Sequence, residues 1–120
     1  MKRFRIIISL VCLMSFAAAP YLFSARLQAS GKLKMLRINQ VGSKYGPGHD
    51  QIDAEVIIQL GSKPGMAFGF KLRNDSNRPV RQGMLDLLRD AYANNLTVTI
   101  DYDITAGKKN GIIVRVWLKR

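Results

Sequence analysis

The chain has 120 residues, 48% of them hydrophobic, and carries 19 basic against 8 acidic side chains, a formal net charge of +11. This length accommodates one domain with a modest core and excludes a second. The single cysteine, Cys12, excludes an intramolecular disulfide. The basic excess either favours an anionic partner, such as nucleic acid, lipopolysaccharide, phospholipid or sialylated glycan, or serves solubility alone.

The N-terminal segment has the layout of a secretory signal peptide. Lys2, Arg3 and Arg5 form a basic start, and residues 6–19 are an uncharged apolar run. We assign residues 1–29 to a signal peptide or membrane anchor. Without the three N-terminal bases, sixteen basic and eight acidic side chains remain, a net charge of +8 for the exported part.

This leader has two candidate cleavage positions, and alternatively it stays uncleaved as a membrane anchor. Alanines at 17–19 satisfy the small-residue rule but precede a proline, and residues 27–29 are a poorer site. Without cleavage, residues 6–25 carry no charge and are long enough to span a bilayer. Both alternatives export the domain, residues 30–120. We therefore expect a periplasmic or secreted protein, or one anchored in the inner membrane with its domain facing the periplasm.

Five segments of the domain alternate apolar and polar residues with period two, as half-buried strands do. We expect strands at residues 33–41, 54–60, 66–73, 96–104 and 112–119. Ser30-Gly31 is interpreted as a short linker before the first strand, whose irregular pattern indicates a bend or a strand shared between two layers. Gly69, on the outer side of the third strand, marks a bend or a place of close packing.

One amphipathic helix lies between the third and fourth strands. Asn and Asp side chains at 74–77 can cap its start, Pro79 is tolerated in its first turn, and apolar residues recur at helical spacing from Val80 to Tyr92. The order β-β-β-α-β-β predicts a mainly β fold with one helix, a five-stranded OB-fold-like Greek-key barrel. Leu85, Leu88 and Tyr92 would cap its core. A generic α+β sandwich is the alternative.

Three apolar residues occupy outward positions of otherwise alternating strands: Ile57, Ile113 and Trp117. Trp117 stands beside Arg115, a combination that is enriched among interface anchors. We interpret Ile57, Ile113, Arg115 and Trp117 as an interface to another copy or to a partner. Alternatively, the helix or the N-terminal segment covers them.

Two loops are the candidate ligand site, because OB-folds bind ligands with the loop between strands one and two and the loop between strands four and five. Here these loops are residues 44–50 and 106–111. Their candidate ligand-binding side chains are Tyr45, His49, Lys108 and Lys109. Aromatic and basic residues together suit a stacked base or a sugar that carries an acid group. Both loops could also be ordinary Gly-rich turns.

Catalytic chemistry has little support in the sequence. His49 is the only histidine, and with Asp50 and Asp53 it offers fewer ligands than a metal site needs. Asp101 and Asp103 share one face of a strand and are interpreted as partners of Lys71, Arg73 or Arg115 on neighbouring strands. We predict a protein that is not an enzyme and has no metal and no cofactor.

The helix end and the strand that follows it, residues 91–102, resemble the binding subunits of subtilase-cytotoxin and pertussis-like bacterial toxins. The resemblance implies an exported OB-fold that forms ring oligomers, binds host sialylated glycans and carries a separate catalytic subunit. That family usually has a disulfide in the barrel, which this domain lacks. The alternative function is the binding of single-stranded nucleic acid or another anionic ligand, which the charge favours and export disfavours.

Overall fold

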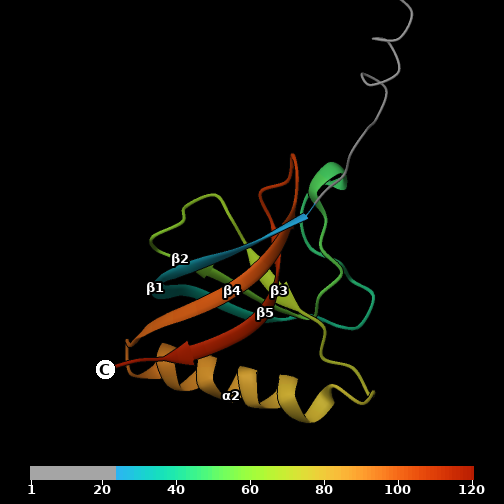
Figure 1. The fold of residues 1–120 in the computed structure, drawn as a ribbon. Coiled ribbons are helices and arrows are strands. Elements are labelled where there is room, and N and C mark those ends of the chain that lie inside the picture. Colours follow the sequence, from blue (N-terminus) through green and yellow to red (C-terminus); the bar gives the residue numbers. More distant parts are fainter. Residues whose placement is uncertain (1–23) are drawn as a thin grey trace, which may run out of the picture.

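The computed structural model describes residues 24–120 (Figure 1). The strands are β1 (Ser24–Ile38), β2 (Val56–Leu60), β3 (Phe68–Phe70), β4 (Thr97–Thr105) and β5 (Gly111–Leu118), and the helices are a short 3-10 turn η2 (Gly48–Asp50) and α2 (Arg78–Ala93). The first 23 residues of the predicted leader lie outside the described part. Within residues 24–120, no helix has both the length and the apolar character needed to cross a bilayer.

The five strands close into a barrel in the order β1-β2-β3-β5-β4, with α2 between β3 and β4 in the sequence. Only the short β3 to β5 pairing is parallel, and the other four pairings are antiparallel. The predicted barrel is confirmed, and this arrangement is consistent with an OB-fold. The sandwich alternative is wrong.

Strand β1 contributes to closure of the barrel because its two parts pair with different neighbouring strands. Its residues 24–32 pair with β4, and its second part, from Leu33 to Ile38, pairs with β2 after a register shift between Leu33 and Met35. The irregular pattern of this strand in the sequence coincides with the register shift in the structure. A long strand that bends at a bulge can change partners without breaking its ladder.

The predicted linker at Ser30-Gly31 is wrong, since both residues lie inside β1 opposite Thr99 and Val98. Small residues fit this part of the strand for packing reasons: Gly31 leaves the room that the Ser62 side chain occupies. Cleavage after Ala29 would remove six residues that pair with β4. The choice between a cleaved leader and an anchor stays a prediction.

The core fills the barrel, and α2 closes one end of it. The helix buries its apolar stripe, Met84, Leu85, Leu88 and Ala91. The inward row of β4, Val98, Ile100 and Tyr102, is buried as predicted. Tyr92 does not cap the core, because 53% of it is exposed in the last turn of α2.

A bulge in β5 changes which residues face inward. Asp101 pairs with Arg115 but Tyr102 pairs with Ile113, which leaves Val114 without an opposite residue. One extra residue reverses the alternation. Consequently Ile113 is buried in the core and Ile112 and Val114 are exposed, the reverse of the prediction, whereas Val116 is buried as expected.

Candidate functional site

The outer side of β2 and β3 is covered by the chain itself. Backbone hydrogen bonds join Tyr45 and Ile52 in both directions, at 2.9 and 2.8 Å, and fold the segment 45–54 back over the strands. A second apolar cluster forms beneath this segment, made of Ile52, Ala54, Ile57 and Ala67. Ile57 points away from the barrel as predicted but has no exposed surface, so its assignment to an interface is wrong.

Gly69 permits this covering layer to pack closely. It lies opposite Ile57 on β2, and a Cβ atom at Gly69 would stand 2.9 Å from the Ala54 Cβ and 3.0 Å from the Ile57 Cδ1. The prediction of close packing at Gly69 is confirmed. The face that strands two and three of an OB-fold present to oligonucleotides and oligosaccharides is therefore occupied here by the chain's own residues.

The two predicted loops meet through a buried pair, Asp50 and Asn110. The Asp50 carboxylate accepts hydrogen bonds from the backbone N–H groups of Lys109 and Asn110, at 3.0 and 3.1 Å. In return, the Asn110 side chain donates to the Asp50 carbonyl and accepts from the Ala67 N–H. Gly46, with φ at +107°, passes close enough to this pair to exclude a side chain. Asp50 therefore holds the two loops together.

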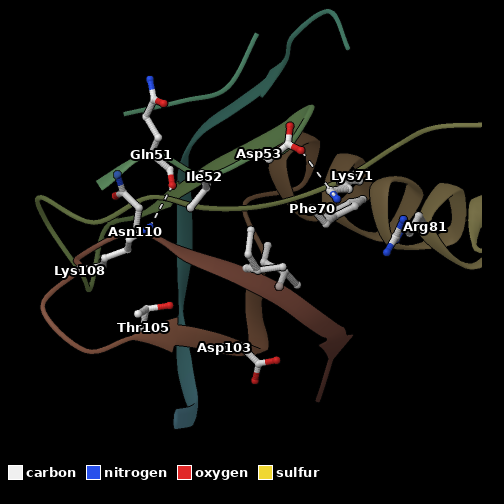
Figure 2. A pocket seen from close by; sticks show the side chains of 12 residues that line it. Gln51, Ile52, Asp53, Phe70, Lys71, Arg81, Asp103, Thr105, Lys108 and Asn110 are labelled. Carbon is white, nitrogen blue, oxygen red and sulfur yellow. Dashed lines mark hydrogen bonds and ion pairs between the residues drawn. The ribbon is translucent and has the colours of Figure 1, made fainter. Parts of the chain in front are cut away.

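A cleft of about 380 Å³ lies beside the Asp50–Asn110 pair (Figure 2). Its lining comes from the segment 51–53, the end of β3, the end of β4, the loop before β5, the start of β5 and one residue of α2. Figure 2 shows Gln51 and Lys108 on one side and Lys71 and Arg81 across from them. Apolar side chains, Ile52, Phe70, Ile112 and Ile113, complete the lining.

The two carboxylates of the cleft are already paired with cations. Asp53 contacts Arg73 at 2.6 Å and Lys71 at 3.7 Å, and Asp103 receives two hydrogen bonds from Arg26, at 2.8 and 3.0 Å. The hydrogen bond from Arg73 lowers the pKa of Asp53, and the one from Arg26 lowers the pKa of Asp103. Both carboxylates are therefore held in their charged form.

Lys108 differs from the other cations of the cleft. No carboxylate of residues 24–120 lies within ion-pairing distance of Lys108, and its Nζ reaches the Gln51 carbonyl at 3.5 Å. Arg81 has one acidic neighbour, Asp75, at 3.7 Å. The cleft thus offers cations to an incoming anion and no unpaired carboxylate to repel it.

Glu55 fixes the wall that carries Asp53 and Lys71. Its buried carboxylate accepts hydrogen bonds from the Arg73 guanidinium, at 2.9 and 2.7 Å, and from the Leu72 N–H at 2.9 Å. The hydrogen bonds from Arg73 lower the pKa of Glu55 despite burial, which acts in the opposite direction. The chain just after β3 is thereby tied to the chain just before β2.

The structure does not bring the four predicted ligand-binding residues together at one site. Lys108 lines the cleft. Tyr45 lines a separate hollow of about 270 Å³, where the Arg37 guanidinium lies 5.6 Å from its ring. His49 and Lys109 are exposed, and Lys109 contacts Asp50 only through its backbone N–H.

Sequence reasoning missed Arg81 and Lys71, which line the cleft opposite Lys108. In the sequence, Arg81 stands among the polar residues of the amphipathic helix, and Lys71 stands at an outward position of the third alternating segment. Nothing in the local pattern distinguishes these cations from other exposed ones. Their meeting depends on where α2 crosses the end of the barrel, which is a tertiary property.

The outer side of β1, β4 and β5 carries polar side chains in cross-strand rows. Arg115 pairs with Asp101 at 3.0 Å, as predicted, and Ser30 shares a hydrogen bond of 2.7 Å with Thr99. Trp117, opposite Thr99, is half-buried. Ile113 faces the core, so its assignment to an interface is wrong, while an interface at Arg115 and Trp117 stays a prediction.

Within residues 24–120, no group of three or more His, Cys, Asp or Glu side chains is placed to hold a metal ion. No model of a protein family matches the chain, and neither a curated protein nor a solved structure matches it. The fold and the cleft are therefore interpreted from their own geometry.

Proposed function

We propose that this protein is an exported, non-catalytic binding module that takes an anionic ligand, in the first place an acidic glycan, in the cleft beside Lys108. The observation that carries the proposal is a cation without an acidic partner on the rim of a cleft whose own carboxylates are neutralised. Export rests on the basic start and apolar run of the leader.

The lining suits a sugar that bears an acid group. Lys108 and Arg81 supply charge for a carboxylate, the Thr105 side chain offers a hydrogen-bonding group for a hydroxyl, and Ile112 offers an apolar surface for a ring face. The hydrogen bonds between Asp50 and Asn110 hold the segment 51–53 and the loop before β5 together before a ligand arrives. A preformed site avoids the entropic cost of ordering loops on binding.

Assembly is part of the same proposal. By resemblance to ring-toxin binding subunits, the barrel would form a homo-oligomer and serve a separate catalytic subunit. Trp117 and Arg115 on the outer side of β5 remain the candidate contacts, because Trp117 keeps part of its surface exposed.

Single-stranded nucleic acid is the second candidate ligand, and the charge supports it. Six of the sixteen basic side chains in residues 24–120 take part in ion pairs, which leaves ten for phosphates. The covering segment 45–54 fills the face on which OB-folds bind oligonucleotides and oligosaccharides alike, so it is the predicted export, and not this face, that ranks nucleic acid second.

Glycan arrays probed with wild-type protein, a Lys108→Ala variant and a Lys109→Ala variant test the proposal. Lys109 is a matched control, since it is the adjacent lysine, is exposed and does not line the cleft. We expect wild type and Lys109→Ala to retain sialylated or sulfated glycans, and Lys108→Ala to lose at least tenfold in affinity.

An equal loss of glycan affinity in both variants would mean that general surface charge accounts for the binding, and it would contradict the cleft as the site. Salt-sensitive retention of single-stranded DNA, without any glycan binding, would favour the nucleic-acid candidate instead.

A further inference from the structure

One end of the barrel, where β4 begins, lies away from the cleft, which takes part of its lining from the other end of β4. Figure 1 shows the bend of β1, the end of α2, the start of β4 and the end of β5 together at the left of the view. The strand register places their residues side by side. Lys32 stands opposite Thr97, and Leu118 stands opposite Val98, the residue that follows Thr97.

The turn after β2 belongs to the same end. The Gly61 N–H donates to the Lys32 carbonyl at 2.9 Å, and Gly61 faces the Lys34 side chain. Lys63 follows in this turn, and two further basic residues follow Leu118 at the end of β5. We define the basic end as five side chains: Lys32, Lys34, Lys63, Lys119 and Arg120.

The cations of the basic end carry uncompensated charge. Lys63 is partly buried, and the other four are exposed. No Asp or Glu side chain of residues 24–120 lies within ion-pairing distance of any of the five. Asp90, in the last turn of α2, pairs with none of them. This end of the barrel therefore presents net positive charge to solvent.

Apolar side chains are exposed beside these cations. Leu96 is 41% exposed, and Tyr92, four residues earlier in the last turn of α2, is 53% exposed. A hollow of about 440 Å³ has Leu96 and Leu118 in its lining together with Lys119 and Arg120. The turn that carries Leu96 is fixed, because the Leu96 N–H donates to the carbonyl of residue 91 at 2.9 Å. Aliphatic and basic side chains thus share one surface.

We propose that the basic end docks on the surface of an anionic lipid bilayer, with Leu96 and Tyr92 in the headgroup region and the five cations over lipid phosphates. Charge complementarity selects the anionic surface, since each Lys or Arg near such a surface strengthens binding about fivefold. The apolar side chains select a bilayer over a nucleic acid, because a bilayer interface takes up exposed leucine and tyrosine. The proposal is independent of glycan binding, because no residue of the basic end lines the cleft.

Co-sedimentation with lipid vesicles tests the proposal, using protein purified after expression of the whole chain. Vesicles of phosphatidylcholine with and without phosphatidylglycerol separate the charge-dependent binding from any contribution of the leader. Wild type should bind the anionic vesicles at least about tenfold more tightly than the neutral ones. The double substitution Lys32→Glu with Lys119→Glu should remove most of this preference.

The matched control is Arg78→Glu with Lys109→Glu, which changes the net charge equally. Both residues are exposed and unpaired within residues 24–120, and both lie outside the basic end. We expect this control to keep the preference for anionic vesicles. An equal loss in the two double variants would overturn the proposal, because general charge would then account for the binding.

Leu96→Ser and Tyr92→Ser test the apolar contribution. Both residues are exposed, so we expect each variant to keep the wild-type circular dichroism and Tm and to bind anionic vesicles at least about fivefold more weakly. Undiminished binding by both folded variants would overturn the proposal, as would equal binding of wild type to neutral and anionic vesicles. Retention of single-stranded DNA at the basic end, without vesicle binding, would also overturn it.

Discussion

The barrel has two outer faces that the chain treats in opposite ways. The covered face, the outer side of β2 and β3, lies under the segment 45–54 and is apolar around Ile57. The open face, the outer side of β1, β4 and β5, meets solvent with polar rows such as Ser30 with Thr99. Both faces come from strands with the same alternation. Alternation therefore tells which side of a strand points outward, and other residues decide whether water reaches it.

The largest expected difference between the faces concerns Ile57. We expect Ile57→Ala to lower the free energy of unfolding by about 2–5 kcal/mol, because it leaves a cavity under the covering segment. Ile38→Ala is the control, since Ile38 is 56% exposed, and it should stay within about 0.5 kcal/mol of wild type. Urea unfolding followed by tryptophan fluorescence measures both. Similar effects of the two substitutions would mean that segment 45–54 does not seal this face in solution.

The next effect concerns the buried carboxylate at the margin of the covered face. Glu55→Ala should destabilise the protein by about 2–3 kcal/mol, since it removes charge-assisted hydrogen bonds to Arg73 and leaves the Leu72 N–H without its acceptor. Glu55→Gln keeps the shape and an acceptor oxygen, so it should cost less. If both variants unfold at the wild-type urea concentration, Glu55 does not tie β3 to β2.

The pH dependence of stability sharpens the same comparison. Hydrogen bonds from Arg73 and Arg26 lower the folded pKa values of Glu55, Asp53 and Asp103 below those of the unfolded chain. Their stabilisation is complete above the unfolded pKa values, near about 4, and is lost as the pH falls through the lower folded values.

Tm measured from pH 7 down to pH 2 should therefore fall steeply below about pH 4. The Glu55→Gln variant should show a shallower fall, because its amide has no proton to bind. A wild-type Tm that rises on acidification would contradict the assigned direction.

The smallest effect is expected on the open face. Ser30→Ala removes the hydrogen bond to Thr99, but water replaces it at this exposed position. The free energy of unfolding should change by no more than about 0.5 kcal/mol. A cost above about 1.5 kcal/mol would show that the open face is covered in solution, for instance by the oligomer contact predicted at Trp117.

The sequence predicted the barrel and the helix well, and the candidate site only in part. The inward row of β4 and the position of α2 follow from residue spacing, which the barrel preserves. The first part of the inward row of β5 was predicted on the wrong side, because Ile112, Ile113 and Val114 are all apolar and a bulge at Val114 leaves no signature in such a run, whereas Val116 was predicted correctly. Of the predicted ligand residues, Lys108 alone lines the cleft.

Local composition thus determined the helix, the presence and order of the five strands, the barrel class and the close packing at Gly69, since these depend on periodicity and side-chain size over a few residues, but it missed the first nine residues of β1. Tertiary structure alone decided that segment 45–54 covers one face, that Asp50 and Asn110 join two loops, and that Arg81 comes to the cleft. Those arrangements join residues far apart in the chain. They depend on how the elements cross in space, which no short stretch of sequence encodes.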